Sequence, residues 1–315
     1  MKKIYTYLLL AVGVAGLSGC NGDDIDYDNS IFFNEAEIAN EAASKNSFDY
    51  WLEDNYLTPY NIDFKYRMEY NESDMEKNLV PADFDKAVAL AKIIKHVWMD
   101  AYNEVIGAEF LRTYVPRTFH LVGSPAYESS GTMVLGTAEG GKKITLYNVN
   151  DLDAQNPDIN MLNEYYFKTM HHEFAHILHQ TRNYDPSFDL ISEGKYIGSN
   201  WYIWTDPETG DTYLRSDLQA WQDGFVTPYA MSEPREDFVE NIAMYVTNDQ
   251  AYWDNMLAQA GEAGAEEINR KFNIVYNYMR DTWNIDLNDL RRVVLRRQTE
   301  ILSLDLTVPE DNTNN

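Results

Sequence analysis

Apolar residues recur every three to four positions along several stretches of the chain, which is the spacing of one face of an α-helix. This spacing predicts helices over residues 81–106, 160–182, 262–282 and 287–302, and a further helix that begins at residue 232. Pro81 and Pro234 suit the first turn of a helix, where the missing backbone N–H costs nothing. Gly107 marks the end of the first helix. The pattern therefore predicts a mainly helical protein.

Runs rich in β-branched and apolar residues occupy the segment between residues 112 and 149 and predict strands. The strand-like runs cover residues 118–123, 132–136 and 142–149. Gly140 and Gly141 provide a hairpin turn before the last run. We expect residues 132–137 or 143–149 to form the sheet edge that can pair with an extended peptide. The predicted fold class is α+β, with a small twisted sheet placed before the second helix.

The N-terminal residues have the pattern of a secretion signal. Lys2 and Lys3 precede a short apolar core, and the sequence that ends in Cys20, Leu-Ser-Gly-Cys, resembles the lipobox at which bacterial lipoproteins are cut and lipidated. Cys20 is the only cysteine in the chain, so no internal disulfide is possible and any metal must be bound by His, Asp or Glu. No other apolar run approaches the roughly 18 residues of a spanning helix. We therefore expect the lipid on Cys20 to be the membrane anchor.

Composition and charge narrow the domain organisation and the partners. We assign residues 1–19 to the signal peptide, 20–46 to an acidic tether, 47–303 to one folded domain and 304–315 to a disordered tail. An apolar content of 44% is enough for a packed core. The net charge of −26 becomes about −28 once the two lysines of the signal are removed. Such a charge argues against nucleic acid as a partner.

The helix predicted over residues 160–182 contains a His-Glu-x-x-His motif, formed by His172, Glu173 and His176. Residues four apart project from the same face of a helix, so the two imidazoles can bind one zinc ion. Glu173 is offset by about 100° and can reach a water molecule on the metal, whose pKa zinc lowers to about 7. Glu173 is then the candidate general base for attack on a carbonyl. Apolar residues flank the motif and favour a buried metal site over a solvated, histidine-rich surface.

A catalytic zinc site needs a third protein ligand. A metzincin would have glycine in place of His179 and histidine in place of Arg182, so that arrangement is excluded and we expect His179 to support the site without binding the metal. Two acids remain, Glu193 in a loop after the motif and Glu236 on the helix that begins at residue 232. Glu236 and Glu240 are one turn apart, so one can bind zinc while the other orients a histidine. We favour Glu236 on this ground and keep Glu193 as the alternative.

The segment over residues 229–240 resembles the lethal-factor-type gluzincins, in which a tyrosine precedes a ligand glutamate and a second glutamate follows it by one turn. By this resemblance Glu236 is the third zinc ligand and Glu240 supports the site. The same resemblance makes Tyr229 the donor of a hydrogen bond to the developing oxyanion. It implies that residues 47–303 fold as a zincin-like metallopeptidase domain of the gluzincin type.

The whole arrangement also resembles the substrate import-associated zinc metallohydrolase lipoproteins, which are encoded beside nutrient-import systems of the starch-utilisation type. The lipobox and residues 171–180, 224–230 and 236–240 carry this resemblance. It implies a zinc-dependent metallohydrolase, most simply a peptidase, with one zinc ion and a peptide or protein substrate. It also implies a lipoprotein of the outer membrane, beside an import complex. The acidic residues after Cys20 resemble a signal for export to the cell surface.

A second function stays open from the residues alone. Residues 183–228 are rich in turns and aromatic side chains, and we expect them to line or cap a cleft. Trp201, Trp204 and Trp221 in this segment would provide stacking surfaces for a peptide or glycan in a zinc-containing binding lipoprotein without hydrolytic activity. Four protein ligands around the metal would favour the binding protein, and an open position for water would favour the hydrolase.

Overall fold

The computed structural model describes residues 45–68, 77–128, 131, 133–134, 136–139 and 142–310. The predicted signal peptide, Cys20 and most of the predicted tether lie outside these residues, so their assignment stays a prediction. From Ser47 onward the chain forms one unit, and the description below concerns that unit alone. No helix in the described part of the chain has both the length and the apolar character needed to cross a membrane.

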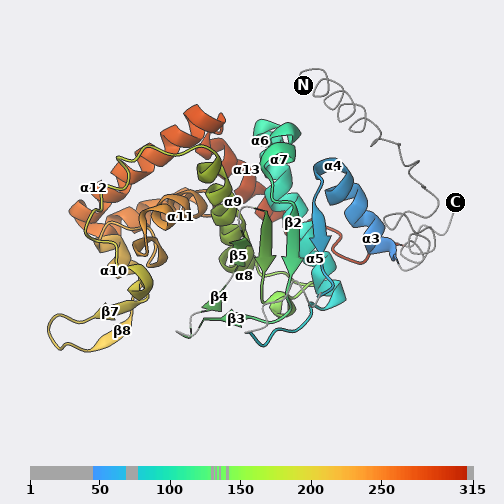
Figure 1. Cartoon of the computed structure of the whole chain (residues 1–315), viewed down its shortest axis with the longest axis horizontal. Helices are drawn as coiled ribbons and strands as arrows, with labels where there is room; N and C mark the ends of the chain where they lie inside the picture. Colours follow the sequence, from blue (N-terminus) through green and yellow to red (C-terminus); the bar gives the residue numbers. More distant parts are fainter. Residues whose placement is uncertain are drawn as a thin grey trace, which may run out of the picture. The chain divides into compact units, whose positions relative to one another are not determined.

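The first half of this unit builds a four-stranded sheet and the helices that cover it (Figure 1). Its elements are α3 (Ser47–Leu52), η2 (Glu53–Leu57), α4 (Thr58–Tyr60), β1 (Asp63–Lys65), α5 (Phe84–Ile94), η4 (Lys95–Met99), α6 (Asp100–Ile106), α7 (Ala108–Tyr114), β2 (Thr118–Leu121), β3 (Ala126–Tyr127), β4 (Met133–Val134), β5 (Gly136–Glu139), β6 (Lys143–Leu146) and η5 (Val149–Asp151). Strands β1, β2 and β6 are parallel, β5 pairs antiparallel with β6, and the order is β1-β2-β6-β5.

This sheet decides between the two predicted edges. Strand β6 is paired on both sides, with β2 and with β5, so residues 143–149 do not form an edge. Strand β5, which overlaps the other predicted range, is one edge, and β1 is the other. The antiparallel pairing of β5 with β6 agrees with the predicted hairpin, whose turn at residues 140–141 lies outside the described residues.

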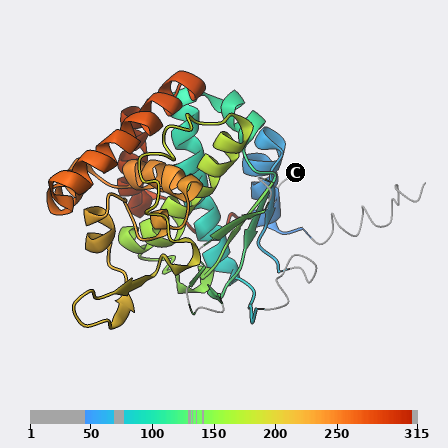
Figure 2. The same cartoon turned by 60° about the vertical axis from the view of Figure 1, so that its left-hand side comes forward.

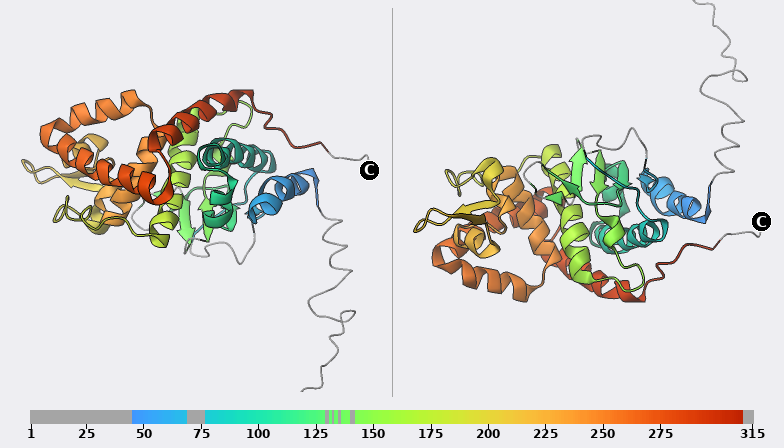
Figure 3. Two further views of the ribbon diagram at one scale, coloured as in Figure 1. Left: turned by 90° about the horizontal axis from the view of Figure 1, so that it is seen from above. Right: turned by 90° about the horizontal axis from the view of Figure 1, so that it is seen from below.

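The second half of the unit is mainly helical, and Figure 2 shows its one hairpin, formed by strands β7 and β8, projecting from the helices. The elements are α8 (Ile159–Leu162), η6 (Asn163–Phe167), α9 (Lys168–Thr181), η7 (Gly198–Asn200), β7 (Ile203–Thr205), β8 (Thr212–Leu214), α10 (Asp217–Gln222), η8 (Tyr229–Met231), α11 (Pro234–Thr247), α12 (Gln250–Trp283), α13 (Leu287–Glu300) and η9 (Ile301–Ser303). Figure 3 shows α12 and α3 at opposite ends of the unit. The α+β class, helix-rich with a small sheet, is confirmed.

The predicted helix over residues 160–182 is present as the continuous run α8, η6 and α9. Asp158 caps its start, where its side chain accepts a hydrogen bond from the backbone N–H of Asn160. Helix α9 packs against α11 on one side and contacts β5 on the other. Figure 1 shows α9 standing between the sheet and the helical half. The helix that carries the motif therefore joins the two halves of the unit.

Other predicted boundaries need correction. The first helix starts at Phe84 and not at Pro81, because Pro81 is drawn into a bridge with Val122 of the sheet region. Residues 112–114, expected as strand, belong to α7, which starts after Gly107 turns the chain with φ 92°. Helix α12 begins well before the predicted residue 262 and continues through a break at Gly261, where φ is 71°.

Aromatic side chains fasten α9 to the rest of the core. The ring of Phe174 on α9 meets Trp98 at 5.2 Å and Tyr102 at 5.1 Å, both edge to face. Trp98 in turn contacts Phe119 of β2 at 6.0 Å. These four side chains are fully or almost fully buried. Each such aromatic pair adds about 0.5–1.5 kcal/mol beyond burial, so this face of α9 is held firmly and the opposite face is left for α11.

Part of the predicted tail is ordered against the domain. Leu306 is buried and joins the core. The Lys92 Nζ donates to the backbone carbonyls of Asp305 and Thr307, at 3.0 and 2.7 Å. The prediction of disorder from residue 304 is therefore wrong for residues 304–310, because one apolar side chain and one lysine tie this segment down. Residues 311–315 lie outside the described part of the chain.

Close packing of α10 on α12 depends on a glycine. A Cβ added at Gly264 would lie 2.3 Å from the Trp221 carbonyl oxygen. We expect Gly264→Ala to destabilise the protein by about 1–3 kcal/mol, because overpacking outweighs the gain of about 1 kcal/mol in helix propensity. Urea unfolding measures this, with Glu266→Ala on the exposed face as the control, expected to change stability by less than about 0.5 kcal/mol. A more stable Gly264→Ala would show that the two helices do not touch there.

Candidate metal centre

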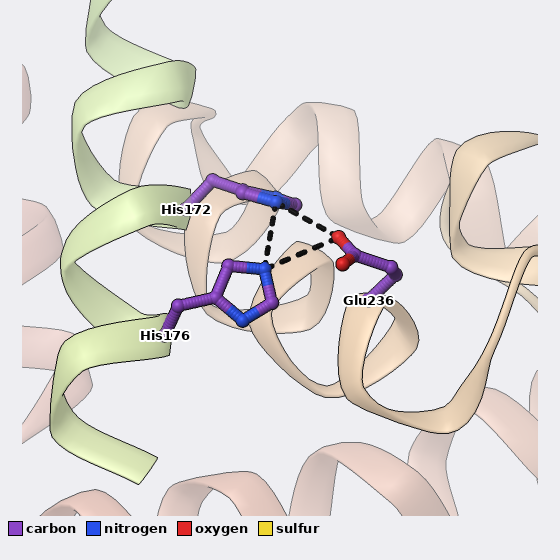
Figure 4. Close-up of side chains that lie close together, drawn as sticks. All are labelled: His172, His176 and Glu236. Carbon is purple, nitrogen blue, oxygen red and sulfur yellow. Dashed lines mark hydrogen bonds and ion pairs between the residues drawn. The ribbon is translucent and has the colours of Figure 1, made fainter. Parts of the chain in front are cut away.

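Two helices bring three metal-binding side chains together. His172 and His176 lie one turn apart on α9, and Glu236 lies in the first turn of α11. Figure 4 shows the three side chains pointing toward one another. The Glu236 Oε2 lies 3.0 Å from the His172 Nε2 and 3.2 Å from the His176 Nε2, and the two nitrogens are 3.2 Å apart. The structure thus assembles the two helical histidines with an acid distant in sequence.

The spacing and chemistry of these atoms fit a zinc ion. Three donors that surround one zinc at about 2.0–2.1 Å with tetrahedral angles lie about 3.3 Å from one another. The three observed separations, from 3.0 to 3.2 Å, are close to that value. Two imidazole nitrogens and a carboxylate oxygen are also a ligand set that zinc takes in catalytic sites.

Glu240 orients His172 through the imidazole nitrogen that faces away from the metal position. Its Oε1 accepts a hydrogen bond from the His172 Nδ1 at 2.8 Å, which leaves the Nε2 for the metal. Its Oε2 lies 3.0 Å from the Lys168 Nζ and accepts a hydrogen bond from the Thr227 hydroxyl at 2.5 Å. Burial alone would raise the pKa of Glu240, but Lys168 and the hydrogen bonds from His172 and Thr227 lower it to about 2. Glu240 therefore stays charged although its side chain is buried.

His179 orients His176 in the same way. The His176 Nδ1 lies 2.9 Å from the His179 Nε2. Because the His176 Nε2 faces the metal position, its Nδ1 carries the hydrogen and donates it to His179. Burial lowers the pKa of His179 to about 4, so this ring stays neutral and able to accept near neutral pH. His179 thus contacts His176 and lies outside the group of three metal-binding side chains.

Glu173 and Tyr229 lie beside the metal group. Glu173 is buried, follows His172 on α9, and has a pKa raised by that burial. The Tyr229 ring, in η8, lies 5.8 Å from the His172 ring. Burial and the Glu236 carboxylate raise the pKa of Tyr229, so its hydroxyl keeps its proton and remains a donor. Glu173 and Tyr229 thus both lie next to the ligand His172, Glu173 in the chain and Tyr229 through its ring, and their predicted roles stay predictions.

The alternative ligand Glu193 does not join this group. It is exposed in the segment after α9, and the metal-binding group found among the described residues contains Glu236 in its place. The two acids differ in their backbone setting. Glu236 lies on α11, which packs along α9, whereas Glu193 lies in a turn and is followed by Gly194 with φ 83°.

Some contributors escaped prediction. Lys168 lies one turn before His172 on the same helix face. This spacing could have predicted its contact with Glu240, because Glu240 was already expected beside His172. Thr227 gives no such signal, because its contact with Glu240 comes from the fold of the segment before η8.

The three tryptophans of the expected stacking surface have different surroundings. Trp221 is buried and its Nε1 donates to the Val226 carbonyl at 3.0 Å, so it belongs to the core. Trp201 packs edge to face against Tyr229 at 5.1 Å. Trp204 lies on the β7–β8 hairpin, where it faces Tyr213. Trp221 is therefore not available as a stacking surface, and the segment expected as loop contains this hairpin and α10.

Comparison with known proteins identifies the family. Residues 41–288 match the family model described as "Putative zinc-binding metallo-peptidase". The chain belongs to this family. It is also similar to a crystal structure of a "putative zinc-binding metallo-peptidase from Bacteroides caccae ATCC 43185", with 47% identity and a TM-score of 0.69 over 87% of this chain and 97% of that chain. No curated protein matches the chain. The family supports zinc as the metal and peptide bonds as the target of hydrolysis.

We expect Glu240→Gln to lower the affinity for zinc by about 10- to 100-fold, because the amide holds His172 less firmly and removes a negative charge beside it. Competition with a chromophoric chelator measures the affinity. Glu164→Gln, which changes an exposed glutamate in η6 on the helical run that carries His172, is the control and should leave the affinity unchanged. Equal affinities in the two variants would remove Glu240 from the support of the metal.

Proposed function

We propose that this chain is a zinc-dependent peptidase of the gluzincin type, with one zinc ion held by His172, His176 and Glu236. The observation that carries the proposal is the number of ligands. The metal-binding group within the described residues has three side chains. Structural zinc sites are closed by four protein ligands, whereas catalytic sites use three and keep a position for water or substrate.

The residues around the group suit the hydrolysis of an amide. Zinc bound there would supply a Lewis acid that acidifies water and polarises the substrate carbonyl. Glu173 accepts a proton from the attacking water as the new C–O bond forms. It then passes that proton to the nitrogen, and the C–N bond breaks to release an amine. The buried position of Glu173, which raises its pKa, makes it a better base for this transfer than an exposed carboxylate.

Tyr229 stabilises the charge that develops on the carbonyl oxygen. Its hydroxyl keeps its proton and lies within hydrogen-bond reach of the proposed ligand Glu236. A donor placed in advance at the developing oxyanion is worth about 10²- to 10³-fold in rate. The packing of the Tyr229 ring against Trp201 supports such a fixed position.

Strand β5 is the proposed binding edge for an extended peptide substrate. It is an edge strand, and it contacts α9 near the motif. A Cβ at Gly136 would lie 2.4 Å from the Thr169 Cγ2, so glycine allows this strand to approach the zinc helix closely. Main-chain hydrogen bonds to such an edge would hold many sequences, which suits a peptidase that serves nutrient uptake.

We also propose that the protein is an outer-membrane lipoprotein, anchored through Cys20, exposed on the cell surface and associated with a nutrient-import complex. The support is the lipobox, the acidic segment after it and the resemblance to import-associated lipoproteins. The competing function is a zinc-containing protein that binds peptides or glycans without hydrolysis. The three-ligand group with Glu173 beside it favours the peptidase.

We expect Glu173→Gln to lower peptide hydrolysis by about 10²- to 10⁴-fold or more while zinc remains bound in full, because the amide cannot accept the proton. Mass spectrometry of a mixed peptide library after incubation measures cleavage, and metal analysis measures zinc. Glu164→Gln again serves as the control and should cleave at the wild-type rate. Wild-type turnover by Glu173→Gln would exclude this residue as the base, and peptide retention without cleavage by the wild type would favour the binding protein.

A further inference from the structure

A short backbone segment, residues 196–201 and here called the strap, runs beside the turn that carries Tyr229. The backbone N–H of Ile197 donates to the Met231 carbonyl at 2.9 Å, and that of Gly198 donates to the Ser232 carbonyl at 3.1 Å. At the end of the strap, Trp201 places its ring edge to face against Tyr229 at 5.1 Å. The strap therefore contacts both the Tyr229 ring and the backbone that follows it.

The turn needs such support. Element η8 is a single 3-10 turn of 3 residues, and its side chains are not fixed by a longer helix. Tyr229 is half-buried, and its ring contacts those of His172 and Trp201. A hydroxyl that acts at a reacting carbonyl must be held closely, since a displacement of about 1 Å can cost about 10²-fold in rate.

The strap is anchored at its start to the ligand helix. The Tyr196 hydroxyl donates to the Asp237 Oδ2 at 3.0 Å, and Asp237 is the residue next to the zinc ligand Glu236. The same Oδ2 lies 2.6 Å from the Lys271 Nζ of α12, and both charged side chains are fully buried. Tyr196 also packs edge to face against Phe225 at 5.5 Å.

The Tyr196 hydrogen bond is an addition to this buried pair and not its only support. Lys271 still neutralises Asp237 when the tyrosine hydroxyl is removed, and it also donates to the Gly224 carbonyl at 2.9 Å. The chain just before the strap has its own tie, because the Lys195 Nζ lies 2.5 Å from Glu267 of α12. Loss of the Tyr196 hydroxyl should therefore loosen the strap and leave the domain folded.

We propose that Tyr196 is a positioning residue for Tyr229, which it fixes through the strap by tying it to Asp237 beside the zinc ligand. The inference rests on the proposed function, because it gives a geometric cause for the activity of Tyr229. By this inference, the buried Asp237–Lys271 pair helps to fix the position of Tyr229 relative to the metal ligands. The zinc ligand Glu236 and the anchor of the strap, Asp237, both lie on helix α11.

The test compares Tyr196→Phe with Tyr276→Phe. The Tyr276 hydroxyl also donates to an aspartate, Asp286, at 3.0 Å, and it is likewise half-buried, so the control removes the same chemistry elsewhere. For Tyr196→Phe we expect kcat to fall about tenfold or more, with KM and zinc affinity unchanged. Tyr276→Phe should keep the wild-type kcat. In a Tyr229→Phe background, Tyr196→Phe should lower kcat no further, because it acts through that hydroxyl.

A second readout does not depend on activity. Hydrogen exchange at the Ile197 and Gly198 amides should accelerate in Tyr196→Phe and stay at the wild-type rate in Tyr276→Phe. Unchanged exchange, or a full further loss of kcat in the Tyr229→Phe background, would overturn the inference. If the wild type binds zinc but cleaves no peptide, the proposed function fails, while faster exchange in Tyr196→Phe still decides whether this residue holds the strap. The two claims therefore fail separately.

Discussion

The structure depends on one contact, that between the carboxylates of α11 and the imidazoles of α9. Glu240 is buried, and a buried charge is tolerated only when it is paired and hydrogen-bonded. His172 and Lys168 of α9, together with Thr227 in the segment before η8, supply those partners. Because these contacts fix how α11 packs against α9, they also bring Glu236 to the two histidines. The aromatic core behind Phe174 holds α9 in place from the other side.

The same contact makes the site favourable for binding a cation. Burial alone would lower the pKa of His172, but its hydrogen bonds with Glu236 and Glu240 raise it to about 10. Burial would raise the pKa of Glu236, and the two histidines lower it. Two imidazoles and two carboxylates arranged in this way favour a positive charge between them. A zinc ion would provide that charge by binding the imidazole Nε2 lone pairs in place of protons.

Local patterns predicted much of this arrangement from the sequence. The motif helix, the α11 helix and the choice of Glu236 over Glu193 follow from periodicity and from the one-turn spacing of Glu236 and Glu240. The parallel pairing of β1 with β2, the β7–β8 hairpin and the ordered residues 304–310 depend on contacts between distant segments, which periodicity does not encode. Thr227 and the strap escaped for the same reason.

Every functional conclusion requires that one zinc ion bind where α9 and α11 meet. Anomalous diffraction at the zinc edge, on crystals of protein purified without chelator or added metal, tests this directly. The expected result is one strong peak per chain, about 2.0–2.2 Å from the Nε2 atoms of His172 and His176 and from a carboxylate oxygen of Glu236, with a further position taken by solvent. A peak elsewhere, no peak, or a fourth protein ligand that closes the site would contradict the hydrolase.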